Sequence, residues 1–288
     1  MTSMLGKTVL ITGANQGIGK ASAAALGALG AKLVLVCRNE AKARAAIADI
    51  ERAGAKNVDL IVADVGSQAE VRRIAREFKS KYDRLDVLLN NAGVLVTERR
   101  TTVDGIEETL AINHLAYFLL TNELLDMLER SGPSRVVNVA SEAHRGVRKV
   151  NFDDLQFERG YRSFAAYSQS KLCNILFTRE LARRVDSKKI TVNSVHPGAI
   201  ASGFGHTYGG FTSVVMKLAR PFLKTPEKGA KTQIYLCSSP EVTGVTGQYF
   251  ADCREKKPSR GARGDDDART LWARSEELTK VSAKVDAA

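Results

Sequence analysis

The feature of this sequence that most constrains its fold is a regular alternation of short apolar runs with longer amphipathic ones. The short runs predict buried strands at residues 7–12, 32–37, 57–62, 86–89, 135–140, 190–195 and 247–250. Helices are predicted between most of them, and the run at 67–82 places its apolar side chains on one face. Strands that alternate with helices indicate βαβ units. We therefore predict an α/β fold in a single domain: a doubly wound parallel sheet of about seven strands with helices on both faces.

A glycine-rich turn follows the first predicted strand. Residues 13–19 read Gly-Ala-Asn-Gln-Gly-Ile-Gly, and an alanine-rich helix is predicted at 18–29. Glycines let a backbone approach a pyrophosphate, and a helix N-terminus offers N–H groups to it. The spacing is G-x-x-x-G-x-G rather than G-x-G-x-x-G, and a plain glycine turn is the alternative. The order strand, turn, helix favours a phosphate-binding loop.

Arg38 follows the second predicted strand, about twenty residues beyond the glycines. In dinucleotide-binding folds an acid at this place binds the ribose 2′-hydroxyl of NAD, whereas an arginine accommodates the 2′-phosphate of NADP. Cys37 stands in the expected acid position, and no Asp or Glu competes at the strand end. The sequence therefore predicts that NADP(H) is preferred over NAD(H). A helix-capping or surface arginine is the alternative.

Tyr167 and Lys171 form a second candidate site. They lie in a helical pattern that runs to about residue 185, and positions four apart share one helix face. A nearby ammonium lowers the pKa of a phenol, which is about 10 when unperturbed. Such a tyrosine can exchange a proton with an alcohol or a carbonyl. The spacing also arises by chance, so the prediction depends on the rest of the chain.

The composition is that of a globular protein, and its cysteines indicate a reducing compartment. The four cysteines are far apart and form no C-x-x-C, which predicts free thiols and no metal site. The chain starts without a secretory-signal pattern and holds no unbroken apolar run near ~18 residues. We expect a cytoplasmic protein without a membrane span.

The net charge is +11. A solvated basic surface explains it, and attraction to phosphates or to an anionic membrane surface is the alternative. Basic residues cluster at 254–263 with no aromatic residue among them. That composition argues against a platform on which single-stranded bases would stack. We therefore expect no nucleic-acid partner.

Taken in order, these motifs resemble the short-chain dehydrogenase/reductase family over about residues 6–250. The resemblance rests on T-G-x-x-x-G-I-G at 12–19, A-D-V at 63–65, N-N-A-G at 90–93, Asn113, Ser141, Y-x-x-x-K at 167–171 and P-G at 197–198. It implies a Rossmann fold and an oxidoreductase. The chain is most similar to the retinol dehydrogenase-like branch, through V-N-V-A-S-E-A-H at 137–144, H-P-G at 196–198, K-T-P-E-K-G-A at 224–230 and G-Q-Y-F-A-D-C at 247–253.

The resemblance implies a catalytic set of four residues. Tyr167 would be the acid-base, and Lys171 would lower its pKa and bind the nicotinamide ribose. Ser141 would hydrogen-bond the substrate oxygen, and Asn113 would hold a water in a proton relay. Alone, these three partners are also compatible with a surface charge, a strand-end turn and a helix–helix hydrogen bond. His196 lies outside the family's catalytic set and is expected to be structural. The implied cofactor-binding residues are Gly13, Asn15, Gln16, Gly17, Ile18, Gly19, Arg38, Asp64, Val65, Asn91, Ala92, Gly93, Tyr167, Lys171, Pro197 and Gly198.

These inferences predict an enzyme that transfers a hydride between NADP(H) and an apolar carbonyl or alcohol, such as an aldehyde, a ketone or a retinoid-like alcohol. A non-catalytic dinucleotide-binding sensor or scaffold is the alternative, and an anionic-surface binder is a third hypothesis that rests on charge alone.

The predicted catalytic domain spans 1–253. It includes a hydrophobic substrate lid at about 199–224, for which a core helix is the alternative. A C-terminal extension with a helix follows at 254–288. Related proteins often pair through the helices found here near 103–128 and 165–185. That resemblance predicts a homodimer unless the insert before Tyr167 or the C-terminal tail blocks the surface.

Overall fold

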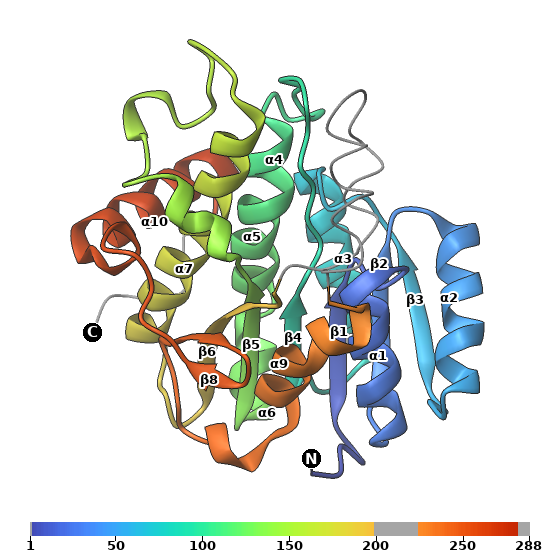
Figure 1. The fold of residues 1–288 in the computed structure, drawn as a ribbon. Helices are drawn as coiled ribbons and strands as arrows, with labels where there is room; N and C mark the ends of the chain where they lie inside the picture. Colours follow the sequence, from blue (N-terminus) through green and yellow to red (C-terminus); the bar gives the residue numbers. More distant parts are fainter. Residues whose placement is uncertain (1, 199–223, 282–288) are drawn as a thin grey trace.

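A single eight-stranded sheet forms the centre of the described molecule (Figure 1). The computed structural model describes residues 2–198 and 224–281. The strand order is β3-β2-β1-β4-β5-β6-β7-β8; all neighbouring pairs are parallel except β7 and β8. The strands are β1 (Thr8–Thr12), β2 (Lys32–Cys37), β3 (Val58–Val62), β4 (Val87–Asn90), β5 (Ser134–Val139), β6 (Ile190–His196), β7 (Tyr249–Ala251) and β8 (Arg254–Glu255).

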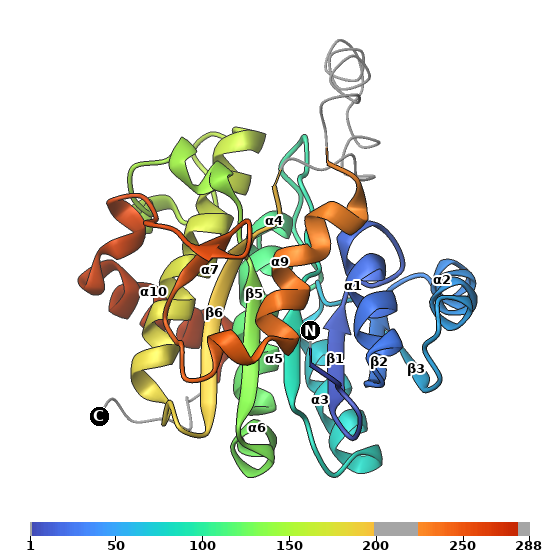
Figure 2. The same ribbon diagram turned by 60° about the horizontal axis from the view of Figure 1, so that its bottom comes forward.

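Helices cover both faces of the sheet (Figures 1 and 2). One layer consists of α1 (Gly17–Ala28), α2 (Glu40–Arg52) and α9 (Pro226–Ser238). The other layer is built mainly from α3 (Gln68–Lys81), α5 (Ala116–Glu123) and α7 (Ser163–Arg184). Successive strand residues point to opposite faces, so Val9 and Ile11 pack in the first layer and Leu10 in the second. The doubly wound parallel sheet predicted from the alternating pattern is confirmed.

The order of the strands reverses at β1. The chain runs outward from β1 through β2 to β3, and β4 then returns to the other side of β1. Open α/β sheets bind ligands beyond the carboxyl ends of the strands at such a reversal, because the connections that leave the two strands diverge there. Gly13 follows β1 and Asn91 follows β4, so both lie at this point.

The helix predicted at 103–128 begins later and is interrupted. It consists of α4 (Glu108–Leu110), a π-helical turn (Ala111–Leu115), α5, and α6 (Leu125–Ser131). The late start has a local cause: the carboxylate of Glu107 accepts hydrogen bonds from the N–H groups of Thr109 and Leu110 and so caps the helix. A π-turn of this kind is frequent at functional sites.

A short antiparallel strand, β8, adds to the predicted set at the edge of the sheet. The chain turns back after β7 through Asp252 and Cys253, whose φ angles are 52° and 57°. Two consecutive residues with positive φ are typical of a two-residue type I′ hairpin, for which Asn-Gly is the usual sequence signal. Asp-Cys lacks that signal, so the sequence does not indicate this hairpin.

The C-terminal helix α10 (Asp265–Thr279) packs along α7 (Figure 1). Its Trp272 is buried against Phe118 of α5 and Phe177 of α7, with ring centroids 4.9 and 6.0 Å away. The guanidinium of Arg184 lies 4.3 Å from the Trp272 ring centroid. Three aspartates occupy the first turn of α10, where carboxylates meet the positive end of the helix dipole. Residues beyond 253 therefore contribute to the main core.

The predicted lid at 199–224 lies outside the described residues, except for Lys224. Across the two described ranges, no helix combines the length and the apolar character that crossing a bilayer requires. Within the same ranges, no three His, Cys, Asp or Glu side chains are grouped so that they could hold a metal ion.

Candidate functional site

The glycine-rich loop packs directly on the turn that follows β4. Gly13 has a φ of 70°, and a Cβ on it would lie 2.8 Å from the Cα of Ala92. A Cβ on Gly19 would lie 2.5 Å from the Nδ2 of Asn91. Both distances are shorter than van der Waals contact allows. The glycines at 13 and 19 are therefore needed for the approach of these two segments.

Hydrogen bonds join the same two segments. The hydroxyl oxygen of Thr12 accepts from the N–H groups of Asn91 and Ala92, at 3.0 Å each. The Asn91 side chain donates to the carbonyls of Thr12 and Gly13, at 2.8 and 3.1 Å. The N-N-A-G stretch and the glycine loop consequently form one rigid unit. In this unit Asn91 supports the loop from behind.

The N-terminus of α1 is open to an anion. Its N-cap residue, Gln16, makes no side-chain capping hydrogen bond, and the first turn holds no acidic residue. The N–H groups of the first turn of a helix have no partner within the helix and carry a partial positive charge. Gly17 has a φ of 58°, which turns the chain into the helix. These features fit the pyrophosphate of a dinucleotide.

Arg38 lies at the carboxyl end of β2 with 68% of its side chain exposed. Its guanidinium approaches one carboxylate oxygen of Asp64 at 3.5 Å, and the other oxygen accepts from the N–H of Gly66 at 2.9 Å. Cys37 is buried beneath the glycine loop. Burial raises the pKa of its thiol, although the N–H groups of Ala14 and Asn15 hydrogen-bond to the sulfur and oppose that shift. The two predicted recognition residues, Arg38 and Asp64, are thus brought together.

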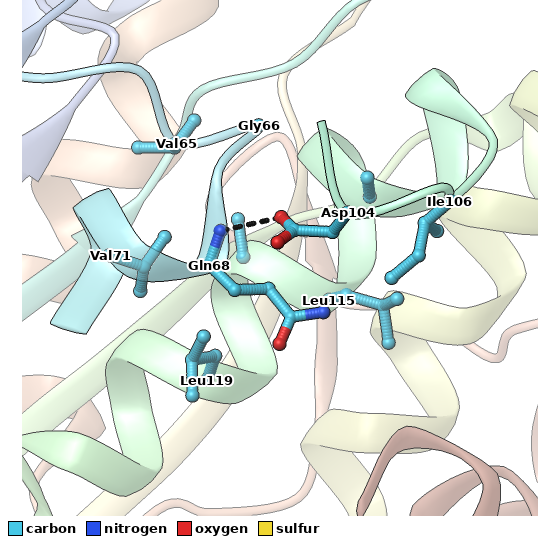
Figure 3. Close-up of a pocket in the computed structure, with 10 residues that line it drawn as sticks. Val65, Gly66, Gln68, Val71, Asp104, Ile106, Leu115 and Leu119 are labelled. Atoms are coloured by element: carbon cyan, nitrogen blue, oxygen red, sulfur yellow. Dashed lines mark hydrogen bonds between the residues drawn. The ribbon is translucent and has the colours of Figure 1, made fainter. Parts of the chain in front are cut away.

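Val65 borders a cavity of about 10 Å³ between the start of α3 and the π-turn (Figure 3). That volume holds about one water molecule and no nucleotide base. Beside the cavity, the N–H of Gln68 donates to a carboxylate oxygen of Asp104 at 2.8 Å, as Figure 3 shows. The cavity is a packing gap, and its lining fixes the loop that carries Asp64 and Val65.

Asn113 lies in the π-turn and is fully buried. Its side-chain oxygen accepts from the N–H of Val94 at 2.7 Å, and its side-chain nitrogen donates to the Val94 carbonyl at 2.9 Å. The same nitrogen donates to the hydroxyl of Ser170 at 2.9 Å, and that hydroxyl donates to the carbonyl of Tyr167 at 2.7 Å. Asn113 thus connects the N-N-A-G turn to the helix that carries Tyr167.

Lys171 is 2% exposed. Its ammonium donates to the carbonyl of Val139 at 3.1 Å and lies 5.6 Å from the ring centroid of Tyr167. It also lies 5.9 Å from the ring centroid of Tyr117. Burial disfavours the charged form and lowers the pKa of Lys171 to about 7. The predicted pairing of Tyr167 and Lys171 on one face of α7 is present.

Ser141 follows β5 and begins a short 3₁₀ helix (Glu142–Gly146). Its hydroxyl oxygen accepts from the N–H of Ala143 at 3.1 Å. A Cβ on Gly146 would lie 2.7 Å from the hydroxyl of Ser168, the residue after Tyr167. The turn that begins at Ser141 is therefore in close contact with α7 at the position of Tyr167.

His196 and Gly198 lie at the end of β6. The Nδ1 atom of His196 accepts from the N–H of Glu142 at 3.2 Å, which ties β6 to the turn after Ser141. Gly198 has a φ of 93°, and a Cβ on it would lie 2.9 Å from the Lys224 side chain. These contacts support the structural role expected for His196.

Sequence reasoning missed three residues near the site. Tyr117 is buried and its hydroxyl donates to the carbonyl of Ala92 at 2.7 Å. Phe164 lies one turn before Tyr167 on α7 and is 60% exposed. His144 is buried beside Ser141. The apolar run of α5 hides Tyr117, and helical spacing from Tyr167 is the one signal that could have indicated Phe164.

Comparison with known proteins agrees with this geometry. Residues 7–209 match the family model for short chain dehydrogenase. The chain belongs to this family. It is 44% identical to retinol dehydrogenase 14 of Homo sapiens, an alignment that covers 95% of this chain and 86% of the relative. It is 40% identical to the human WW domain-containing oxidoreductase, over 95% of this chain and 68% of the relative.

Two solved structures of similar proteins cover nearly the same length. An uncharacterised protein of Mycobacterium paratuberculosis is 32% identical, with a TM-score of 0.80 over 98% of this chain and 97% of that chain. The RhlG/NADP active-site complex of Pseudomonas aeruginosa is 25% identical, with a TM-score of 0.70 over 90% of this chain and 98% of that chain. This short-chain dehydrogenase is accordingly an oxidoreductase that uses a nicotinamide dinucleotide and acts on small molecules.

Replacing Lys171 with Met should separate activity from stability. The substitution removes a buried ammonium, and the Val139 carbonyl keeps a second donor, the side chain of Asn174 at 3.1 Å. We expect turnover to fall at least ~10²-fold. The melting temperature of the cofactor-free protein at pH 7 should rise, by about 2–4 °C for each kcal/mol of burial cost removed.

The effect should depend on pH in a defined direction. Because the pKa is lowered, the folded state binds fewer protons than the unfolded chain between about pH 7 and the usual value of 10.5. The cost of burying Lys171 therefore falls as pH rises, and the melting temperatures of variant and wild type should converge toward pH 9–10. Lys42→Met, on the exposed side of α2, is the control. A variant several degrees less stable than the wild type at pH 7 would contradict this account.

Proposed function

We propose that this protein exchanges a hydride between NADP(H) and an apolar carbonyl or alcohol. The observation that carries the proposal is the buried Lys171 ammonium, 5.6 Å from the Tyr167 ring centroid. A buried charge is costly unless it serves a function. It lies beside β5, next to the strands whose ends hold the glycine loop and Asn91.

The proposed chemistry assigns one role to each residue of the set. The bound nicotinamide supplies or accepts the hydride. In the reducing direction the Tyr167 hydroxyl gives its proton to the substrate oxygen, and the nearby Lys171 cation favours the phenolate that remains. The hydrogen bond from the Ala143 N–H uses an acceptor site of Ser141. It leaves the seryl proton for the substrate oxygen as charge develops there.

Asn113 has a positioning role in this proposal. Both ends of its amide are engaged, with Val94 on one side and Ser170 on the other. Those bonds fix the distance between the N-N-A-G turn and α7, and so the distance between the cofactor loop and Tyr167. The wide π-turn turns its side chain toward this junction.

The preference for NADP(H) over NAD(H) is supported by the exposure of Arg38. Its contact with Asp64 is 3.5 Å long and involves two exposed side chains. Pairs of this kind contribute about 0–1 kcal/mol, so a 2′-phosphate can replace Asp64 at little cost. A guanidinium binds a phosphate through two parallel hydrogen bonds. The RhlG relative, which is 25% identical, was solved as a complex with NADP.

An apolar substrate is supported by Phe164. Its ring lies beside the turn after Ser141, 3.2 Å from where a Cβ of Gly146 would stand. It shares a face of α7 with Tyr167 and Lys171. Several relatives at 40–44% identity are named retinol dehydrogenases. We propose that Phe164 contacts the apolar part of the substrate.

A cytoplasmic location is also proposed, because all four cysteines have free thiols. Disulfides are rare in reducing compartments, and free thiols persist there. The expected homodimer through α5 and α7 meets an obstacle. Trp272 of α10 already packs on Phe118 and Phe177, which belong to those two helices. We propose that the chain does not pair through this surface.

Tyr167→Phe tests the catalytic role. The change removes the transferable proton and little volume. NADPH-dependent turnover of a panel of aldehydes and ketones should fall by ~10²–10⁴-fold, with NADPH binding by fluorescence titration nearly unchanged. The control is Tyr235→Phe on α9, where the hydroxyl bonds Glu241. Equal turnover of variant and wild type would show that Tyr167 is not the acid-base, and no turnover by wild type would favour a dinucleotide sensor.

Arg38→Gln tests the cofactor preference. The change removes the guanidinium that would bind the 2′-phosphate. A charge-assisted hydrogen bond contributes about 1.5–3 kcal/mol, so the dissociation constant for NADPH should rise ~10- to 100-fold. That for NADH should change little. Arg44→Gln, also on the exposed surface, is the matched control. Equal binding of the two cofactors by wild type would refute the preference.

Phe164→Ala tests the substrate class. Because the side chain is 60% exposed, its loss should leave the melting temperature nearly unchanged. The kcat/KM for a long-chain or ring aldehyde should fall about tenfold, since burying a large apolar side chain contributes about 1.5–3 kcal/mol. A three-carbon aldehyde should be affected much less. Leu5→Ala, at an exposed apolar position before β1, is the control. An equal loss for short and long substrates would remove Phe164 from the binding site.

A further inference from the structure

His144 is held between Ser141 and the segment after β8. It is fully buried. Its Nδ1 atom lies 2.7 Å from the Ser141 carbonyl oxygen, and a carbonyl only accepts, so Nδ1 carries the proton. The N–H of Ser259 then donates to Nε2 at 3.0 Å. Two fixed partners therefore define one neutral tautomer of the imidazole.

The Ser141 carbonyl receives two hydrogen bonds from the same residue. The backbone N–H of His144 donates to it at 3.1 Å, in addition to the imidazole Nδ1–H. The hydroxyl oxygen of Ser141 is held separately by the N–H of Ala143. Both the backbone and the side chain of Ser141 are consequently fixed by the turn that follows it.

This turn is also fastened to the end of the sheet. The Tyr249 hydroxyl donates to the carboxylate of Glu142 at 2.7 Å, and the Tyr249 ring meets the His144 ring edge-on at 5.3 Å. Arg145 donates to the Lys257 carbonyl at 2.9 Å. A Cβ on Gly261 would lie 2.1 Å from the Arg148 carbonyl oxygen, so the two segments are in direct backbone contact.

We propose that His144 is a positioning residue, which holds the carbonyl of Ser141 and thereby places the seryl hydroxyl against the substrate oxygen. The proposal rests on the function proposed above. It also gives the segment at 254–263 a purpose that its charge does not suggest: through Ser259 it fixes the tautomer and orientation of His144. A displacement of reacting groups by about 1 Å can cost ~10²-fold in rate.

Two substitutions separate the two hydrogen bonds of the imidazole. The amide of His144→Asn reaches the position of Nδ1 and can still donate to Ser141, but it does not reach the position of Nε2. The amide of His144→Gln reaches the position of Nε2 and can still accept from Ser259. Each variant leaves one buried partner without its bond, so the two are matched in stability, which melting temperatures check. We expect kcat to stay within about threefold for Asn and to fall ~10- to 100-fold for Gln.

A double-mutant cycle tests whether His144 acts through Ser141. With Ser141→Ala in place, adding His144→Gln should lower kcat by less than about twofold, because the hydroxyl that His144 places is gone. NADPH binding should be equal in all four proteins. Equal kcat losses for Asn and Gln, or losses that multiply in the double variant, would overturn the proposal while the wild-type turnover keeps the proposed function. Absence of wild-type turnover would overturn both.

Discussion

The site depends on the removal of one ammonium group from water. Lys171 is enclosed by α7, β5 and the ring of Tyr117, and burial lowers its pKa to about 7. A cation in such surroundings is stabilised by whatever negative charge can come near it. The phenolate form of Tyr167 and a bound dinucleotide are both anionic. The core therefore stores, in one side chain, an electrostatic preference that ligand binding and catalysis can use.

The strands, the order of the layers and the location of the site could be predicted from the sequence. Apolar runs of strand length predict the sheet, and glycines at 13 and 19 permit a contact that a Cβ would prevent. Both signals are local in the chain. The pairing of Tyr167 with Lys171 is likewise a consequence of helix geometry over one turn. The roles proposed for these residues remain predictions.

Other features depend on contacts between segments far apart in the chain, and local patterns do not contain them. The cap at Glu107 and the π-turn at Asn113 shorten and divide a helix that the apolar pattern predicts as continuous. The bond from Ser259 to His144 joins residues 115 positions apart. Arg38 has an acidic neighbour that its own strand end does not indicate, because Asp64 reaches it from another strand end.

The C-terminal helix links the outer surface to the catalytic region. His114, which follows Asn113, hydrogen-bonds the hydroxyl of Ser275 on α10 at 2.9 Å. Burial lowers its pKa to about 4, so the imidazole is neutral near pH 7. The π-turn is thus held from one side by Val94, through Asn113, and from the other by α10, through His114. Because a π-turn lacks the regular bonds of an α-helix, both contacts are needed to define where Asn113 points. The segment after residue 253 therefore supports the site at two places, Asn113 through α10 and Ser141 through His144.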